Sequence, residues 1–560
     1  MRNLIDLNYV LAIDIFVEFI NTEYFINKYD KFDVYDIAGI LNKILLKNFD
    51  DGLKILKNIN DIQKYPTLSK NQQVLLTDSI LNYKEGDRSK PEILEKVYDE
   101  YINQLLKSYD DNIDKIVHRF SFSQAREAIV KFAETLSIEE EINDNIGKAL
   151  RIVEVFINDP NPYLPGKDPE DPKDEYNEQK RVTENKGMIF ITSVRGWCAQ
   201  TLMHCATIKG RNYIKKIIEL TEKLTKDENY YIKLMSCFPL SQLARNRLSH
   251  MPDNNDELFY SKNRQEALRM AKDVEKIAFS LLENISQFVP DVQNTLVKSI
   301  LSVFHHIRAL NEKDALKLVH IFRKMSNESI AEAIPLFIYY AELRNDQFKN
   351  WSIVDPGFYD DLLPDKFNMQ IFRDILIDLI KNGSSEVRIA IAGDFMALPK
   401  QSKERNEQSE FEKIFKLSIK YLTLITEAYE HRVFEYIYLF VKEYINEKPE
   451  ECIFLWEEAI KKEKEYIITN KEKAQKMSWW ISHYHDRVIM KIKEVKGNDR
   501  FLEWFNFLSE YPREIYLGDI KELAKLLLEF PKNDLAKKIL DNLVERNSSF
   551  YDLQQEWLNK

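Results

Sequence analysis

Residues 193–202, SVRGWCAQTL, follow a long polar stretch and begin a segment with helical periodicity. Val194, Ala199 and Leu202 fall on one face of a helix at this spacing, and Arg195 lies beside them. A lone segment of this kind predicts only an amphipathic helix. Its significance depends on whether the same pattern occurs elsewhere in the chain.

The pattern returns twice. Beginning 38 residues later, YIKLMSCFPL (231–240) again gives a β-branched residue, a base and then small residues, and GSSEVRIAIAGDFMAL (383–398) repeats it. Periods of this length are typical of two-helix repeats that bury their apolar faces only by stacking on neighbours. The matching positions are Val194, Ile232 and Val387; Arg195, Lys233 and Arg388; Ala199, Cys237 and Ala392; and Leu202, Leu240 and Phe395.

The rest of the chain also has helical periodicity. Apolar residues recur at three- and four-residue spacing in stretches such as NYIKKIIELTEKL (212–224), with short polar breaks between them. With 560 residues, of which 44% are hydrophobic, the chain can bury a large core. Only 13 glycines occur and no phosphate-binding glycine motif is present, which argues against an NTPase or a dinucleotide enzyme.

Breaks in the pattern divide the chain into four parts. We predict a helical N-terminal region (1–157), a loop or linker rich in proline and acids (158–186), helical repeats (187–349) and C-terminal helical repeats (350–560). Proline prevents helix and the acids disfavour burial, so the loop is expected to be solvated. Pro239 and Pro335 fall within apolar helical stretches and are expected to kink their helices.

The segments 187–251 and 371–398 resemble HEAT repeats, whose second helix often begins with a turn acid or Asn, then Val-Arg, then small residues and Leu. The resemblance implies an all-α fold of stacked antiparallel helix pairs, a curved α-solenoid. It also implies that Arg195 and Arg388 brace neighbouring repeats rather than bind a ligand. The repeats further resemble the helical sensor arms of some bacterial defence ATPases, although this sequence has no ATPase motif.

A second motif suggests chemistry. In LARNRLSHMP (243–252), Arg245 is followed by Asn246 and, one helical turn later, by His250. This arrangement resembles the Arg-polar-x3-His motif of HEPN ribonucleases, which are metal-independent. The resemblance implies His250 as the acid–base group, Arg245 as the phosphate clamp and Asn246 as the orienting group. The alternative is a helix end, where basic residues offset the helix dipole.

Basic and aromatic residues interleave in KEKAQKMSWWISHYHDRVIMKIKEVK (471–496). Phosphate neutralisation and base stacking use such residues, so a nucleic-acid-binding solenoid is another hypothesis. The alternative is an amphipathic helix with its aromatic residues and Val488 buried. The candidate nucleic-acid-binding residues are Lys473, Lys476, Trp479, Trp480 and Arg487.

The leading functional hypothesis is a non-enzymatic helical-repeat scaffold that binds a protein partner in the cytoplasm, with a role in bacterial defence suggested by the sensor-arm resemblance. The four cysteines form no C-x-x-C pair. Asp6, Asp14 and Glu18 interrupt the apolar residues at the N-terminus, so we expect no signal peptide. We also expect no membrane span, no metal site and no cofactor. The net charge of −11 disfavours a general nucleic-acid surface. The oligomeric state is left open.

Overall fold

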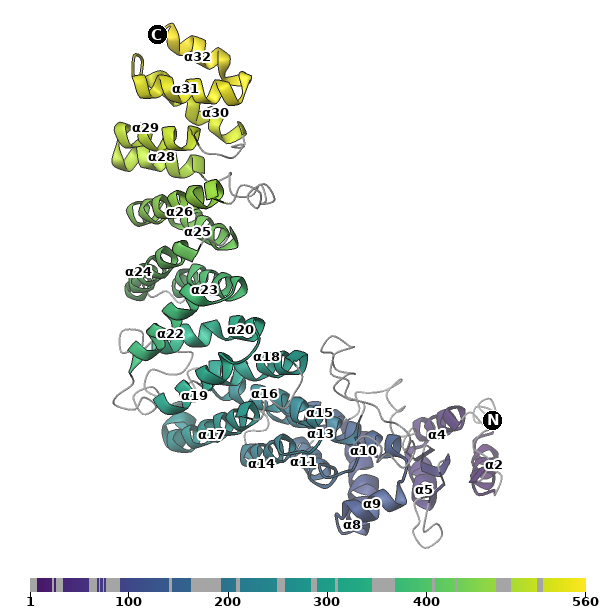
Figure 1. Cartoon of the computed structure of the whole chain (residues 1–560). Helices are drawn as coiled ribbons and strands as arrows, with labels where there is room; N and C mark the ends of the chain where they lie inside the picture. The colour runs from purple at the N-terminus through teal and green to yellow at the C-terminus, as the bar shows by residue number, and fades with distance from the viewer. Residues whose placement is uncertain are drawn as a thin grey trace. The chain divides into compact units, whose positions relative to one another are not determined.

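The computed structural model describes the chain in segments, and every regular element in these segments is a helix. The chain divides into two compact units (Figure 1), the first holding the described residues up to Asp314 and the second those from Ala315 onward. The described residues are 8–22, 25–26, 34–59, 68–69, 71–73, 75–76, 91–139, 144–162, 193–207, 212–248, 257–283, 290–307, 311–344, 368–404, 408–428, 431–469, 485–510 and 517–560.

The first unit is built in two layers of helices. One layer is formed by α10, α13, α16 and α18, each packed against the next, and α14 packs on α17 in the other layer. The helices are α2 (Tyr9–Ile20), α4 (Val34–Lys47), α5 (Phe49–Ile59), α7 (Pro91–Val97), η3 (Tyr98–Ile102), α8 (Asn103–Ser108), α9 (Ile113–Arg119), α10 (Ser123–Ile138), α11 (Asn145–Phe156), α13 (Val194–Cys205), α14 (Ile214–Thr225), α15 (Tyr230–Met235), α16 (Cys237–Leu248), α17 (Glu257–Glu283) and α18 (Pro290–Ile307).

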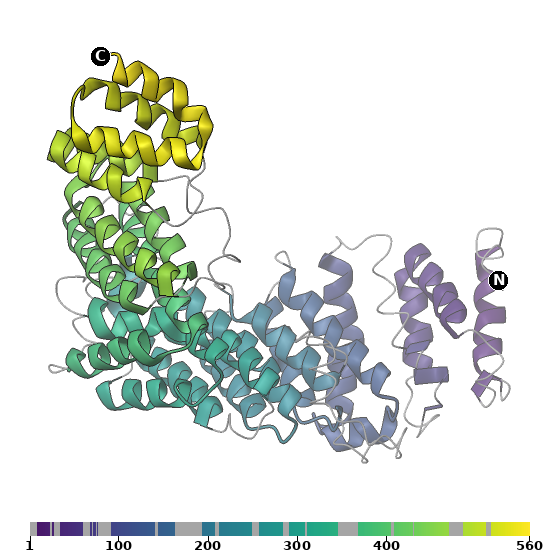
Figure 2. The same ribbon diagram turned by 45° about the horizontal axis from the view of Figure 1, so that its top comes forward.

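The second unit repeats this architecture. Here α20, α23 and α25 form one layer, and α22, α24 and α26 form the other; α28 and α29 pack as a pair, with α31 against α29. Figure 2 shows these C-terminal pairs from a second direction. The helices are α19 (Glu312–Phe322), α20 (Asn327–Ile338), η6 (Tyr339–Leu343), α22 (Met369–Asn382), α23 (Ser385–Glu404), α24 (Gln408–Ile425), η8 (Thr426–Ala428), α25 (His431–Tyr444), α26 (Pro449–Thr469), α28 (His485–Lys496), α29 (Asn498–Ser509), α30 (Leu517–Lys525), η10 (Leu526–Glu529), α31 (Asp534–Arg546), η11 (Ser548–Phe550) and α32 (Tyr551–Leu558).

Two glycines allow helices to pair at short range. Gly497 alone links α28 to α29, and its φ of +87° is a backbone conformation that side chains with a Cβ rarely adopt. Gly52 lies where α5 crosses α4, and a Cβ there would come within 2.4 Å of the Leu45 side chain. Glycine therefore permits the reversal of the chain between α28 and α29 and the close contact between α4 and α5.

The packing confirms the predicted register. The aligned apolar positions of all three segments are buried. They lie on α13, on α15 and α16, and on α23. Helices α13 and α16 belong to the layer that contains α10, α23 belongs to the layer that contains α20, and α15 leads directly into α16. Helical pairs stacked in two layers define an α-solenoid, so the predicted fold class is confirmed. The fully buried or nearly fully buried positions are Val194, Ala199, Leu202, Ile232, Cys237, Leu240, Val387, Ala392 and Phe395.

The predicted kink at Pro239 is seen as a one-residue interruption at Ser236, whose backbone stays in the right-handed helical region. The helix that starts at Tyr230 stops after Met235, and α16 starts at Cys237. The proline ring clashes with the carbonyl four residues earlier, which belongs to Met235, and proline cannot donate a hydrogen bond to it. At Pro335 the helix instead continues through α20 and passes into the π-helical turn η6.

The buried register leads to a stability prediction. Leu202→Ala removes a fully buried side chain between layers and should lower the free energy of unfolding by about 2–5 kcal/mol. Ile138→Ala is the control, because Ile138 is 53% exposed on α10 in the same unit. Urea unfolding followed by circular dichroism measures both variants. Equal midpoints for the two would show that position 202 does not belong to the core.

Candidate functional site

A buried ion pair lies where the predicted loop begins. Arg126 of α10 and Asp159 are both completely buried, with Arg126 Nε 2.7 Å from Asp159 Oδ2 and Nη2 3.3 Å from Oδ1. Arg126 Nη1 also donates to the carbonyls of Phe120 and Ser121. Burial raises the pKa of Asp159, and the guanidinium of Arg126 opposes that shift. The sequence predicted that the loop 158–186 is solvated. At Asp159 this prediction is wrong, because Arg126 of α10 supplies a matched cation.

The same junction holds the start of α13. The Asn161 side chain accepts from the backbone N–H of Val194, and its carbonyl accepts from Arg195. Arg195 Nη2 donates to the Pro162 carbonyl at 2.8 Å, while its Nε lies 3.3 Å from Asp227 Oδ2, in the connection between α14 and α15. The predicted bracing role of Arg195 is confirmed. Arg388 donates to the Gly383 carbonyl, in the turn before its own helix.

The cysteines near this junction are packing groups. All four cysteines of the chain are free and buried, and Cys198 and Cys205 point into the core from α13. Burial raises the pKa of the Cys198 thiol well above its usual value. A thiol with a raised pKa is a poor nucleophile and a poor metal ligand at neutral pH, so neither cysteine provides chemistry here.

The buried pair yields a second stability prediction. Arg126→Met leaves the Asp159 carboxylate buried without its cation and should cost about 3–5 kcal/mol of unfolding free energy. The matched control is Arg151→Met, because Arg151 and Asp111 form an exposed pair at 3.4 Å whose loss should cost at most about 1 kcal/mol. Urea denaturation compares the two. A loss of equal size in both variants would contradict a structural role for the buried pair.

The candidate ribonuclease motif lies at the end of α16. Arg245 and Asn246 belong to the last turn of this helix, which ends at Leu248. Their side chains and all of His250 lie outside the described residues. The catalytic assignment of Arg245, Asn246 and His250 therefore stays a prediction, as does the alternative that they form a helix terminus.

The basic and aromatic cluster is described only from His485 onward, so Lys473, Lys476, Trp479 and Trp480 lie outside the described residues. Within α28, Arg487 is exposed and Val488 is buried, as the amphipathic alternative predicted. His485 is also buried, and its Nδ1 accepts from Trp456 Nε1 at 3.0 Å. His485 therefore contributes to the packing between α26 and α28.

Acids neutralise most of the basic residues that follow on α28. Lys493 Nζ lies 2.6 Å from Glu529, and Lys496 lies 3.6 Å from Glu450. Lys491 pairs with Glu494 along the helix at 2.7 Å. Side chains that already bind carboxylates have less charge to offer a phosphate. Arg487 is the one predicted nucleic-acid-binding residue among the described residues, and within that part of the chain it forms no ion pair.

A buried acid joins three elements of the second unit. Glu342 lies in the π-helical turn η6 and is almost fully buried. Arg373 of α22 binds it through two hydrogen bonds of 3.0 Å, and Tyr421 Oη of α24 donates to Oε1 at 2.5 Å. Lys420 Nζ lies 3.7 Å away. With this set of donors Glu342 is a cross-link between helices rather than a free general base.

Asp394 differs from the acids described above. It lies on α23 inside the repeated segment, and burial raises its pKa to about 7. Perturbed pKa values also mark functional sites, but ion pairs and hydrogen bonds around Asp394 are absent within the described part of the chain. The neighbouring Gly393 packs on the ring of Tyr436 from α25. Asp394 is thus a carboxyl group that folding moves away from water without a counter-charge.

The raised pKa predicts how stability depends on pH. The folded chain holds a proton on Asp394 that the unfolded chain has released above pH 3.8, so stability should fall as pH rises from about 4 to about 7. Asp394→Asn removes this dependence, so its thermal midpoint relative to that of the unchanged chain should be higher at pH 8 than at pH 5. Thermal unfolding across this range, with Asp374→Asn on the exposed part of α22 as control, measures the effect. An unchanged pH profile in Asp394→Asn would contradict it.

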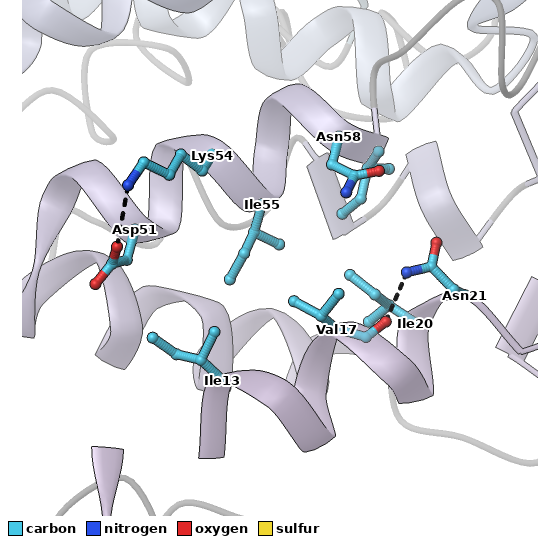
Figure 3. A pocket seen from close by; sticks show the side chains of 9 residues that line it. Ile13, Val17, Ile20, Asn21, Asp51, Lys54, Ile55 and Asn58 are labelled. Carbon is cyan, nitrogen blue, oxygen red and sulfur yellow. Dashed lines mark hydrogen bonds and ion pairs between the residues drawn. The ribbon is translucent and has the colours of Figure 1, made fainter. Parts of the chain in front are cut away.

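A hollow lies between α2 and α5 in the described part of the chain (Figure 3). It has a volume of about 180 Å³, and Ile13 and Val17 of α2 face Ile55 of α5 across it. The Asp51–Lys54 ion pair, at 3.6 Å, lies at one end, and Asn21 and Asn58 lie at the other. We refer to this feature, lined by Ile13, Val17, Ile20, Asn21, Asp51, Lys54, Ile55, Asn58 and Ile59, as the α2–α5 groove.

The sequence pattern predicted no functional site in this N-terminal region. The available signal was the composition of α2, YVLAIDIFVEFI, in which Asp14 and Glu18 are the only charged residues. A helix at the surface needs only one apolar stripe, yet α2 is apolar on most of its circumference. Val10, Leu11 and Ile15 are consequently 69%, 46% and 38% exposed.

The described parts of the chain contain neither a metal cluster nor a helix suited to a membrane. No group of three or more His, Cys, Asp or Glu side chains gathers there as a metal site would require. Among the same helices, none combines the length and the apolar run needed to cross a bilayer.

The fold defines a helical-repeat protein of the α-solenoid class. No protein-family model and no curated protein matches the sequence. The chain is similar to the crystal structure of an engineered protein from the Northeast Structural Genomics Consortium, with 12% identity, coverage of 96% of this chain and 98% of that chain, and a TM-score of 0.27. It is also similar to Kap121p in its complex with Ste12p, with 11% identity, coverage of 98% and 68%, and a TM-score of 0.24. Scores this low establish no common fold, so the class rests on the packing of the helices themselves.

Proposed function

We propose that this chain is a non-enzymatic scaffold that binds a protein partner through exposed faces of its stacked helices. The observation that carries this proposal is the apolar surface of α2, where Val10, Leu11 and Ile15 stand exposed and another face of the same helix lines a groove. Exposed apolar residues gathered on one element mark interaction sites more often than isolated ones do. The stacked helices supply a rigid support for such a surface.

The charges favour a protein partner over a nucleic acid. Acids on neighbouring helices bind many of the described basic residues, and the chain carries an excess of negative charge. Nucleic-acid binding depends on basic groups that are available to phosphates. The pairs that connect different helices, or a helix with the turn next to another helix, include Lys216–Glu154, Arg323–Asp378, Lys403–Glu447, Lys448–Glu412, Lys493–Glu529, Arg500–Glu457 and Lys538–Glu510.

We further propose a cytoplasmic location, which the four buried free thiols support because such cysteines suit a reducing compartment. The sensor-arm resemblance adds the proposal of a role in bacterial defence. The identity of the partner decides that point. A partner that is itself a nuclease or an ATPase would support it, and a partner from central metabolism would contradict it.

Capture of the partner tests the scaffold proposal. The tagged full chain, expressed in its source cells and cross-linked before purification, should retain one protein that co-elutes with it at a fixed ratio in size-exclusion chromatography. Leu202→Ala, which weakens the repeat core, should lower the amount retained. A chain that retains no protein at a fixed ratio under these conditions would overturn the proposal.

Two assays separate the scaffold from the alternatives. For a scaffold, we expect that the chain shows no RNA cleavage dependent on His250, which His250→Ala tests. We also expect that it shows no salt-sensitive binding of single-stranded RNA dependent on Lys473, Lys476 and Arg487, which the triple variant Lys473→Glu, Lys476→Glu and Arg487→Glu tests. Cleavage lost in His250→Ala would establish the HEPN-like ribonuclease. Binding that falls steeply with salt and disappears in the triple variant would establish the nucleic-acid-binding solenoid.

A further inference from the structure

We infer that the α2–α5 groove binds a helical segment of a protein partner, with one aliphatic side chain in the pocket and a lysine or arginine about one turn away. This inference rests on the proposed scaffold function and names the site and the chemistry of the partner. Its three supports are the shape of the groove, the exposed residues on its edge and the charges beside it.

The shape suits one aliphatic side chain. The floor of the groove is formed by isoleucine and valine side chains from two helices, and its volume is about 180 Å³. An apolar cavity of about 150 Å³ is large enough to bind benzene. The polar groups lie at the ends: the Asp51–Lys54 pair at one and Asn21, which donates to the Val17 carbonyl at 2.7 Å, at the other.

The apolar lining continues out of the groove along α2. Val10, Ile13 and Val17 follow one another at three- and four-residue spacing, so they form one stripe of the helix. Ile13 and Val17 line the groove, whereas Val10, at 69% exposure, extends the stripe beyond it. A groove between two helices with an apolar stripe at its edge matches the way in which amphipathic helices bind to helical proteins.

The charges beside this stripe are acidic. Asp14 follows Ile13 and Glu18 follows Val17, so both acids lie on the flank of the stripe that faces solvent. Both are exposed, and within the described residues neither carboxylate has a hydrogen-bond or ion-pair partner.

Asp51, the acid of α5 that lines the groove, already has hydrogen-bond and ion-pair partners. Asp51 accepts hydrogen bonds from Asn48 at 2.7 Å and from Tyr9 at 3.4 Å, and it pairs with Lys54. Among the described residues, the carboxylates near the groove that lack a partner are therefore those of Asp14 and Glu18 on α2.

These positions define the pattern of the partner. A segment that places an aliphatic residue between Ile13 and Ile55 brings residues one turn away over Asp14 and Glu18. Lysine or arginine at those positions complements the carboxylates, whereas a phosphate or an acidic segment would be repelled. The charges thus favour a basic amphipathic helix.

The test uses a phage-displayed library of helical peptides selected on the full chain, with the Val10→Asp variant as the counter-selection target. Val10 is mostly exposed, so its replacement should leave the fold unchanged, which circular dichroism verifies. We expect enriched peptides that carry Leu, Ile or Met with Lys or Arg three or four positions away. Enrichment of acidic peptides, or of none that distinguishes the two targets, would overturn the inference.

Fluorescence anisotropy of one enriched, labelled peptide then measures how much Val10 and the two acids contribute to its binding. Val10→Asp should weaken binding about tenfold, as the loss of an interface anchor typically does. Asp14→Lys with Glu18→Lys should weaken it about threefold to tenfold at low salt and less at high salt. Ile138→Asp, a change at an isoleucine of α10 that is 53% exposed, should leave binding unchanged.

The outcomes separate this inference from the scaffold proposal. If Val10→Asp and Ile138→Asp bind the peptide equally, or if Val10→Asp retains the captured partner as well as the unchanged chain does, the groove is not the site and the scaffold proposal stands. If the unchanged chain retains no partner, the scaffold proposal fails as well. Binding to phosphatidylcholine vesicles that Val10→Asp abolishes would assign the surface to a membrane and overturn the inference.

Discussion

The apolar stripe of a helix in this chain is wider than one neighbouring helix can cover. In α13, Val194, Ala199 and Leu202 are fully buried only because α10 and α16 pack on either side. The same holds for α23, with α20 and α25 as its neighbours. Burial of these stripes is the main favourable term in folding, and it can be satisfied only by adding layers of helices. The solenoid class follows from this constraint.

Polar contacts fix the connections between the stacked helices. The Arg126–Asp159 pair, Asn161 and Arg195 hold the start of α13 against α10 and against the connection before α15. In the second unit, Glu342 ties η6 to α22 and α24. These buried groups are costly unless every partner is present, so they select one arrangement of helices that apolar packing alone would leave open.

The surface follows from what the stack leaves uncovered. Ion pairs between helices use up many basic side chains, whereas α2 keeps exposed valine, leucine and isoleucine next to two acids that have no partner among the described residues. In the proposed scaffold, the apolar groove would provide affinity and the acids would discriminate among partners.

Helical periodicity alone predicts the class of fold and the register of its core. Val194, Ile232 and Val387 could be aligned because helical periodicity is a local property that a single chain displays directly. The burial of Asp159 could not be read in this way, because its cation lies 33 residues earlier on α10. Likewise, α2 shows its apolar composition in sequence, but only packing against α5 decides which residues line a groove and which remain exposed. Local periodicity specifies which side of a helix is apolar, and tertiary contacts between distant segments decide what covers it.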